Sequence, residues 1–352
     1  MTKNEYKVIG VMSGTSLDGI DLACVTFTYE TTWKFKITCC NTVGYSQAWL
    51  QILKELVSQS SEALKQIDSK YTAHLAQVIN TFIQENNIQN IDAICSHGHT
   101  ALHKPEKGLT YQIGNLKELA TLTNNKVVCD FRVQDVALGG QGAPLVPIGD
   151  QLLFSEYDYC LNLGGFANVS YQENENRIAY DICPVNIVLN KYANRLGFPY
   201  DDKGKIAKSG TYLMQLGNDL RNLVFYKQKP PKSLGLEWVE TEIFPRLDAF
   251  KRKEKDLLRT FTEHASSQIA RNFNIRSNVL VTGGGAYNDY LISRIKFNKE
   301  LNIIIPSKEI IEFKEALIFG FLGVLKIREE VNCLSSVTGA KQNHSSGKIY
   351  LP

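Results

Sequence analysis

Two stretches of the chain open with the same order of elements, and this order restricts the fold more than any other feature of the sequence. Each stretch begins with a strand pattern, a glycine-containing polar turn and two further strand patterns, and then changes to helical periodicity. The strand patterns lie at 7–13, 20–28 and 33–39 in the first stretch and at 158–163, 168–172 and 177–181 in the second. The sequence therefore predicts an α/β protein with two related units.

The boundary between the units is expected within 139–150, where the segment GGQGAP combines flexible glycines with one rigid proline. We expect domains at 1–140 and 141–352, with the final segment free to pack back on the first domain. Two such domains facing across a cleft would place their glycine turns opposite each other. This geometry suits a clamped nucleotide, and domain closure would exclude water.

Composition and charge narrow the class of protein. The 352 residues carry a formal net charge of +3, with 43% hydrophobic and 21% charged residues, which is typical of a soluble globular protein. The modest charge argues against nucleic-acid binding, and no apolar run approaches the roughly 18 residues of a membrane helix. The eight cysteines are scattered without a CxxC pair, which favours reduced thiols over disulfides or a zinc site. We expect a cytoplasmic protein without membrane or nucleic-acid partners.

The stretch GTSLDGID at 14–21 is the first candidate for phosphate binding. Its glycines let the backbone approach an anion closely, and Thr15, Ser16 and backbone N–H groups can donate hydrogen bonds to phosphate oxygens. The carboxylate of Asp18 suits a hydrated Mg²⁺. The stretch also fits a plain β-hairpin whose polar turn needs glycine. It is not a Walker A loop, because it lacks the Gly-Lys-[Ser/Thr] ending.

Two further glycine turns occupy matching places in the pattern. Gly164 and Gly165 lie between two strand patterns. Gly283, Gly284 and Gly285 lie between a strand and a helix, where an adenine and its α-phosphate could rest on the backbone and the helix N-terminus. Each turn alone is also explained as a tight connection, but three of them in a two-unit α/β chain favour a nucleotide.

Asp181 ends the strand pattern that follows the second glycine hairpin, and the sequence DICPVN begins there. A carboxylate at a strand end facing a domain cleft is well placed to act as a general base. Aspartate is also a common N-terminal helix cap, and Pro184 is tolerated at the start of a helix. Spacing alone favours the cap.

Polar residues at other strand ends are candidates for substrate contacts. His97 and His99 would share one face of a strand, but no third ligand nearby completes a metal site, so hydrogen bonding or surface exposure is expected. Arg132 could clamp a carboxylate through its bidentate fork, or form an interdomain salt bridge. Glu315 suits the N-terminal end of a buried helix and could equally reach the cleft.

Nine stretches together resemble the anhydro-N-acetylmuramic acid kinase family over almost the whole chain. The most specific is DFRVQDVALGGQGAPLVP at 130–147, which has no general reason to occur elsewhere. The others are VMSGTSLDGIDLA at 11–23, SHGHT at 96–100, YQIGN at 111–115, LNLGGFANVSY at 161–171, YDDKGKIAKSG at 200–210, PPKSLG at 230–235, VTGGGAYN at 281–288 and SSVTGA at 335–340.

The resemblance implies two actin-like (ribonuclease H-like) domains flanking a nucleotide and substrate cleft. It implies an ATP- and Mg²⁺-dependent kinase that opens a 1,6-anhydro sugar with water and phosphorylates its 6-oxygen, giving N-acetylmuramic acid 6-phosphate in peptidoglycan recycling. A homodimer is expected on the same ground. By this resemblance Asp181 is the catalytic base, and His97, Arg132 and Glu315 contact the sugar. ATP would be bound by Gly14, Thr15, Ser16, Leu17, Asp18, Gly19, Ile20 and Asp21.

Two departures from the family pattern bear on the substrate. The family's DTGPGN is DICPVN here, so Cys183 and Val185 replace glycines and would narrow a pocket that approaches them closely. His99 replaces the glutamine of SHGQT. The alternatives are therefore a kinase for another anhydro sugar such as levoglucosan, a non-kinase ATPase on the same scaffold, and a nucleotide-binding protein that has lost activity.

Overall fold

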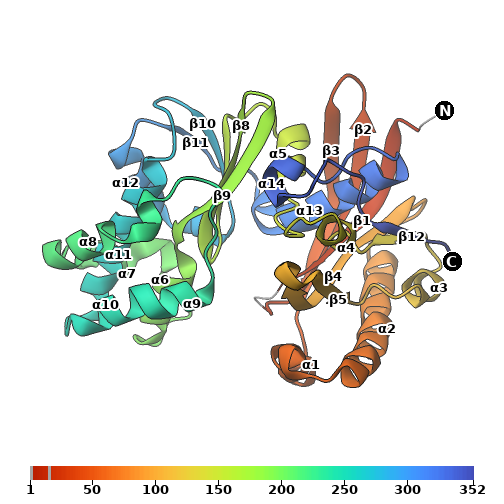
Figure 1. Cartoon of the computed structure of the whole chain (residues 1–352), viewed down its shortest axis with the longest axis horizontal. Coiled ribbons are helices and arrows are strands. Elements are labelled where there is room, and N and C mark those ends of the chain that lie inside the picture. The colour runs from red at the N-terminus through yellow and green to blue at the C-terminus, as the bar shows by residue number, and fades with distance from the viewer. Residues whose placement is uncertain (1–2, 15–16) are drawn as a thin grey trace. The chain divides into compact units, whose positions relative to one another are not determined.

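The computed structural model describes residues 3–14 and 17–352, and the chain divides into two compact units (Figure 1). The first unit contains the chain up to Leu153 together with Phe313–Pro352, and the second contains Phe154–Glu312. The first unit thus extends past the boundary expected at residue 140, and the final segment belongs to it. In Figure 1 the blue ribbon of this final segment lies among the red strands of the N-terminal part.

The first unit is built on a mixed sheet. Its strand order is β12-β6-β4-β1-β2-β3, and β5 pairs with β4 off this path. The neighbours β1, β2 and β3 are antiparallel, whereas β4 is parallel to both β1 and β6. The strands are β1 (Glu5–Ser13), β2 (Ile20–Tyr29), β3 (Trp33–Val43), β4 (Ala93–Lys104), β5 (Leu109–Ile113), β6 (Val127–Cys129) and β12 (Lys348–Tyr350).

The helices of the first unit are held by apolar side chains from both ends of the chain. Helix α2 packs Tyr71, Leu75 and Ile79 into a core shared with the sheet. An added Cβ on Gly10 of β1 would lie 1.8 Å from the carbonyl oxygen of Ala316 in α13, so this contact between strand and helix requires glycine. The helices are α1 (Gln47–Lys54), α2 (Ser61–Glu85), α3 (Glu118–Thr123), α4 (Val133–Ala137), α5 (Pro147–Leu153), α13 (Lys308–Ile327) and α14 (Ser335–Thr338).

The second unit repeats the central arrangement of the first. Its strand order is β11-β10-β7-β8-β9, with β7, β8 and β9 antiparallel and with β10 parallel to both β7 and β11. The strands are β7 (Tyr159–Leu163), β8 (Phe166–Glu173), β9 (Asn176–Pro184), β10 (Asn278–Thr282) and β11 (Asn302–Ile304). Three antiparallel strands followed by two parallel ones, present twice, confirm the predicted α/β class with two ribonuclease H-like sheets.

The helices of the second unit share one apolar core with its sheet. Helix α11 is central to it and contributes Leu257, Phe261, Ala265 and Ile269, all buried. The helices are α6 (Asn186–Asn194), α7 (Lys205–Ser209), α8 (Met214–Arg221), α9 (Leu236–Trp238), α10 (Phe244–Ala249), α11 (Glu254–Ala270) and α12 (Asp289–Asn298). Across the described residues of both units, we find no helix with the length and apolar character needed to cross a membrane.

Candidate active site

The predicted phosphate turn of the first unit connects β1 to β2. Thr15 and Ser16 lie outside the described residues. Leu17 has a positive φ of 63° and donates its N–H to the carbonyl of Gly14 at 3.3 Å, and Asp18 is exposed. A ligand could therefore reach Gly14, Leu17 and Asp18 from solvent.

Gly19, Ile20 and Asp21, at the end of the predicted phosphate turn, make packing and hydrogen-bond contacts within the first unit. An added Cβ on Gly19 would lie 2.7 Å from the carbonyl oxygen of Val43, and the side chain of Ile20 is fully buried in the core. Asp21 accepts a hydrogen bond from Thr42 at 2.6 Å. Of these three residues, Ile20 could contact a nucleotide only through its backbone.

A buried hydrogen-bonded cluster lies at the start of this turn. The hydroxyl of Ser13 is 2.8 Å from Nδ1 of His99, 2.8 Å from the hydroxyl of Tyr71 and 2.5 Å from that of Tyr45. Burial lowers the pKa of His99 to about 4, so its ring is neutral near pH 7. The cluster fixes the last residue of β1, directly before the glycine turn. Of the two roles expected for His99, the structure shows the hydrogen bond and not the surface exposure.

The structure brings together the sugar-contact candidates of the first unit. Nε of Arg132 donates to Nε2 of His97 at 2.8 Å, and Nη1 donates to the carbonyl of Gly142 at 2.6 Å. His97 therefore carries its proton on Nδ1, which lies 2.8 Å from the carbonyl of Gly98. Burial, followed by the Arg132 charge, holds the pKa of His97 well below its usual range.

Glu315 shares the electrostatic environment of this pair. Glu315 keeps solvent-exposed surface, but desolvation by the surrounding protein raises the pKa of its carboxyl, and the Arg132 charge opposes that rise. Burial lowers the pKa of Arg132 to about 10, and Glu315 is the first charge that opposes this shift. Arg132 thus remains a cation at neutral pH, and its Nε and Nη1 already have partners within the unit.

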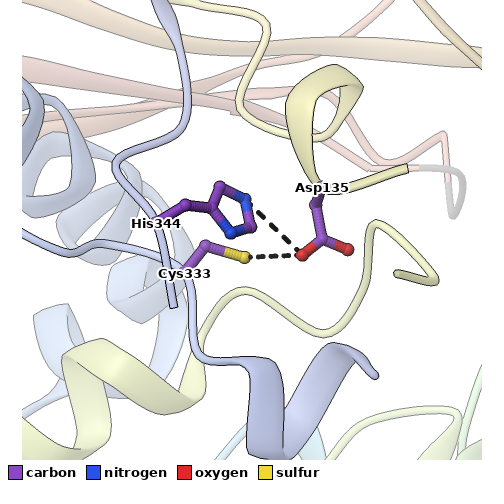
Figure 2. Close-up of side chains that lie close together, drawn as sticks. All are labelled: Asp135, Cys333 and His344. Atoms are coloured by element: carbon purple, nitrogen blue, oxygen red, sulfur yellow. Dashed lines mark hydrogen bonds and ion pairs between the residues drawn. The ribbon is translucent and has the colours of Figure 1, made fainter. Parts of the chain in front are cut away.

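A second buried cluster ties the C-terminal segment to the GGQGAP loop (Figure 2). Oδ1 of Asp135 accepts hydrogen bonds from Thr338 at 2.7 Å and from the Cys333 thiol at 3.1 Å, and Nε2 of His344 lies 3.6 Å away. Oδ2 accepts from the backbone N–H of Gly142 at 2.7 Å. Asp, Cys and His are also zinc-ligand types, but the oxygens of Asp135 already accept donors from both segments, so we interpret the cluster as a structural hub.

In the second unit, the two predicted glycine turns meet at the end of β7. An added Cβ on Gly283, which has a positive φ of 79°, would lie 2.8 Å from the carbonyl carbon of Leu163. An added Cβ on Gly285 would lie 2.7 Å from Cβ of Leu163. Asn186, the first residue of α6, donates its side-chain amide to the carbonyl of Leu163 at 3.1 Å. Both turns and the start of α6 therefore converge on one strand end.

Two of the remaining glycines of these turns, Gly165 and Gly284, are not required by protein packing, whereas Gly164 is held more tightly. The nearest atom to an added Cβ is 3.8 Å away at Gly165 and at Gly284, and 3.3 Å away at Gly164. None of the three has a positive φ. Gly165 and Gly284 are also exposed. Glycine with room for a side chain is expected where a ligand approaches the backbone.

Asp181 lies on β9 and caps no helix. The N-cap of α6 is Val185, which makes no side-chain cap hydrogen bond. Instead, Oδ2 of Asp181 accepts the backbone N–H of Leu234 at 2.8 Å, and its own N–H donates to the carbonyl of Lys232 at 3.1 Å. Burial raises the pKa of Asp181, and the Leu234 hydrogen bond opposes the rise. The helix-cap interpretation is wrong, which leaves this carboxylate available for chemistry.

The two side chains that replace family glycines point into the core of the second unit. Cys183 and Val185 are fully buried members of its apolar cluster. The thiol of Cys183 lies 3.9 Å from the carbonyl of Ala265 in α11. These substitutions therefore fill space beneath the strand end, and the expected narrowing of a pocket does not follow from their positions.

Comparisons with known proteins agree over the full length of the chain. The sequence profile of the family described as anhydro-N-acetylmuramic acid kinase matches residues 6–352. A protein of that name from Mannheimia succiniciproducens is 34% identical over 378 residues, covering 99% of this chain and 100% of that protein. Another from Bacillus cereus (strain Q1) is 32% identical over 380 residues, covering 98% and 99%.

Among solved structures, component A of the (R)-2-hydroxyglutaryl-CoA dehydratase of Acidaminococcus fermentans aligns with 92% of this chain and 99% of that one. Its TM-score is 0.48 at 14% identity. Likeness of this extent carries no functional argument.

Proposed function

The chain belongs to the anhydro-N-acetylmuramic acid kinase family, and on that premise we propose that it is an ATP-dependent kinase for 1,6-anhydro-N-acetylmuramic acid. The product would be N-acetylmuramic acid 6-phosphate, an intermediate of peptidoglycan recycling and amino-sugar catabolism. The observation that carries the proposal beyond family membership is Asp181, a half-buried carboxylate on a strand that is free of any helix-capping role.

The glycine turns support the choice of ATP as the phosphoryl donor. Gly165 and Gly284 have room for a Cβ that the fold does not fill, and both are exposed. We propose that the nucleotide occupies this space in the second unit, with Gly283 and Gly285 shaping the turn. In the first unit, Gly14 to Asp21 would contact phosphates, and Asp18 would hold Mg²⁺ through water. Mg²⁺, when bound, neutralises charge that develops on the phosphates.

The chemistry begins at a water molecule beside Asp181. The carboxylate takes a proton from this water as its oxygen bonds to the anomeric carbon of the sugar. The bond from that carbon to the bridging O6 breaks, and the freed O6 attacks the γ-phosphorus of ATP, with ADP as the leaving group. The reaction consumes the sugar, one water molecule and ATP, and it yields the sugar 6-phosphate, ADP and one proton, which is first held by Asp181. The raised pKa of Asp181 brings its basicity closer to that of an effective base at neutral pH.

We assign the sugar contacts of the first unit to His97, Arg132 and Glu315. The neutral ring of His97 fixes the guanidinium of Arg132 through their 2.8 Å hydrogen bond, so Arg132 is preorganised. We also propose a cytoplasmic, homodimeric enzyme. The eight cysteines, scattered along the chain without a CxxC pair, are compatible with a reducing compartment.

A product analysis tests the function. The protein is incubated with Mg-ATP and either 1,6-anhydro-N-acetylmuramic acid or levoglucosan, and phosphorylated sugars are identified by mass spectrometry and ³¹P NMR. We expect a 6-phosphate of N-acetylmuramic acid from the wild type and its loss in Asp181→Asn. Asp202→Asn, an exposed aspartate of the same unit, should keep full activity and serves as the matched control.

Three outcomes would contradict the proposal. Preferred turnover of levoglucosan would move the substrate to a different anhydro sugar. ATP hydrolysis that ignores both sugars would indicate a non-kinase ATPase. Retained activity in Asp181→Asn would remove the catalytic role from that carboxylate.

A further inference from the structure

The loop at 230–235 lies against β9 and makes two hydrogen bonds with Asp181, the proposed base. The N–H of Asp181 donates to the carbonyl of Lys232, and the N–H of Leu234 donates to Oδ2 of Asp181 at 2.8 Å. Only Ser233 separates the two contacts. The backbone of Lys232 is thus fixed next to Asp181 by these two hydrogen bonds.

The ammonium group of Lys232 is half-buried, and no carboxylate pairs with it in residues 3–14 and 17–352. It lies 4.6 Å from the ring centre of Phe225 and 5.9 Å from that of Tyr180, and its one hydrogen bond is a long contact of 3.4 Å to the carbonyl of Phe225. Burial lowers the pKa of Lys232, and no carboxylate among the described residues opposes that shift. Cys183 is nearby, but burial raises the pKa of its thiol and keeps it neutral. Aromatic rings and one long hydrogen bond to a carbonyl hold the cation.

A second lysine of the chain, Lys314, is buried and paired with a carboxylate, and it serves as a comparison for Lys232. Nζ of Lys314 in the first unit lies 2.7 Å from Oδ1 of Asp150, and both side chains are almost fully buried. Removing an ammonium group from water without an anionic partner is unfavourable, so buried lysines are normally paired. The half-buried Lys232, without such a partner in the part of the chain described, is suited to receive one from a ligand.

We propose that the ammonium group of Lys232 binds the lactyl carboxylate of the sugar and so selects a muramic substrate over a neutral anhydro sugar. The inference rests on the proposed function and deepens it. At neutral pH that carboxylate is the one ionised group of 1,6-anhydro-N-acetylmuramic acid, and Lys232 is tied through its backbone to the base that serves the same sugar. Arg132, the other cation considered for this role, already uses Nε and Nη1 on His97 and Gly142.

An anion beside Lys232 could also come from a phosphate of ATP, so the test must separate the two sources. We compare 1,6-anhydro-N-acetylmuramic acid with its carboxamide, which keeps the size of the lactyl group and removes its charge. Values of kcat/KM for both sugars and KM for ATP are measured in the wild type, Lys232→Met and Lys232→Arg. Lys227→Met, an exposed lysine of the neighbouring turn, is the matched control. Circular dichroism and thermal melting verify that each variant is folded.

The wild type should prefer the acid over the carboxamide by about 10- to 100-fold, the range of a hydrogen bond to a charged group. Lys232→Met should lose this preference by lowering kcat/KM for the acid alone, with KM for ATP unchanged. Lys232→Arg should keep part of the preference, and Lys227→Met all of it.

Five results would overturn the inference. The preference could persist in Lys232→Met, or vanish in Arg132→Gln while Lys232→Met retains it, which would move the carboxylate to Arg132. Lys232→Met could lower kcat/KM equally for both sugars and raise KM for ATP, which would show that the lysine binds a phosphate of ATP. A wild type that uses both sugars without preference would remove the need for a carboxylate site. If the wild type phosphorylates neither sugar, the proposed function itself fails, and the inference falls with it.

Discussion

Two adjacent glycines of the second unit should respond to alanine in opposite ways. Gly283 has a φ of 79°, and its added Cβ would lie 2.6 Å from Oδ1 of Asn162 and 2.8 Å from the carbonyl carbon of Leu163. Gly284 is exposed, has no positive φ, and would place its Cβ no closer than 3.8 Å to any protein atom. One glycine is thus required by the fold, and the next is not.

The expected magnitudes follow from these contacts. Gly283→Ala combines a left-handed backbone, about 1–2 kcal/mol, with overpacking against backbone, about 1–3 kcal/mol, so the free energy of unfolding should fall by roughly 2–5 kcal/mol. For a unit of this size each kcal/mol lowers Tm by about 2–4 °C, which gives a loss of roughly 4–20 °C. Gly284→Ala should change stability by no more than about 0.5 kcal/mol, as for an ordinary surface position.

Function should reverse the order of the two variants. If ATP lies against Gly284, its new methyl group overpacks the nucleotide by about 1–3 kcal/mol, and KM for ATP rises roughly 5- to 150-fold with little change in Tm. Calorimetry gives Tm, and a coupled assay of ADP release gives KM. A Gly284→Ala variant with unchanged KM for ATP would refute the placement of nucleotide at this turn. An equally stable Gly283→Ala would refute the packing on which the argument rests.

Three further predictions concern the other buried polar groups. Activity should fall as pH drops through a value above that of an ordinary aspartate, because Asp181 must be ionised to act as a base and burial raises its pKa; a pH profile of kcat/KM with no acidic limb above pH 4 would contradict this. Asp135→Ala should lower the free energy of unfolding by roughly 1.5–4.5 kcal/mol in urea titrations. It leaves the N–H of Gly142 buried without an acceptor, about 1–3 kcal/mol, and removes the shorter hydrogen bond of Thr338, about 0.5–1.5 kcal/mol, whose hydroxyl keeps the carbonyl of Leu334 at 3.3 Å. Asp202→Ala is the exposed control, and equal stability of the two variants would exclude the hub. His264 is buried with a pKa lowered to about 3, and neither ring nitrogen has a hydrogen-bond partner among the described residues. The neutral ring therefore contributes stability above pH 6.5 that is lost as pH falls toward 3, and His264→Phe should flatten the loss of Tm over that interval; an unchanged slope would show that the ring does not titrate in this way.

The strongly patterned elements were predictable from the sequence. The strand at 278–282 matches β10 residue for residue, and the openings of both units match β1 to β3 and β7 to β9 within a few residues. Period-2 apolar patterns and glycine turns are local signals, and here the tertiary structure agrees with them. The three-residue strand β12 is not predicted, because it is completed by pairing with β6, far away in the sequence. Strand β5 is also missed from the sequence, although it forms a local antiparallel hairpin with β4. The short helices α7 to α10 are also missed by the sequence analysis, because they are too short to show sustained helical periodicity.

The candidate site likewise has residues that local sequence patterns indicate and residues that only the fold reveals. Glycine turns and strand-end residues carry visible signals, so the turns at 164–165 and 283–285 and the pair His97–Arg132 were named from the sequence, and the structure brings the members of each set together. The hub at Asp135 and the cluster around Ser13 join residues far apart in sequence, which no local pattern reveals. The choice between base and helix cap for Asp181 also needed the fold, since only the position of the loop at 230–235 identifies the partner of this carboxylate.

The most direct measurement of the central claim is the position of isotope after a reaction in H₂¹⁸O. With Mg-ATP and 1,6-anhydro-N-acetylmuramic acid, we predict ¹⁸O on the anomeric carbon of the product and none in the phosphate, because water primed by Asp181 opens the ring and O6 receives the phosphoryl group. Label in the phosphate, or an unlabelled sugar phosphate, would contradict the account.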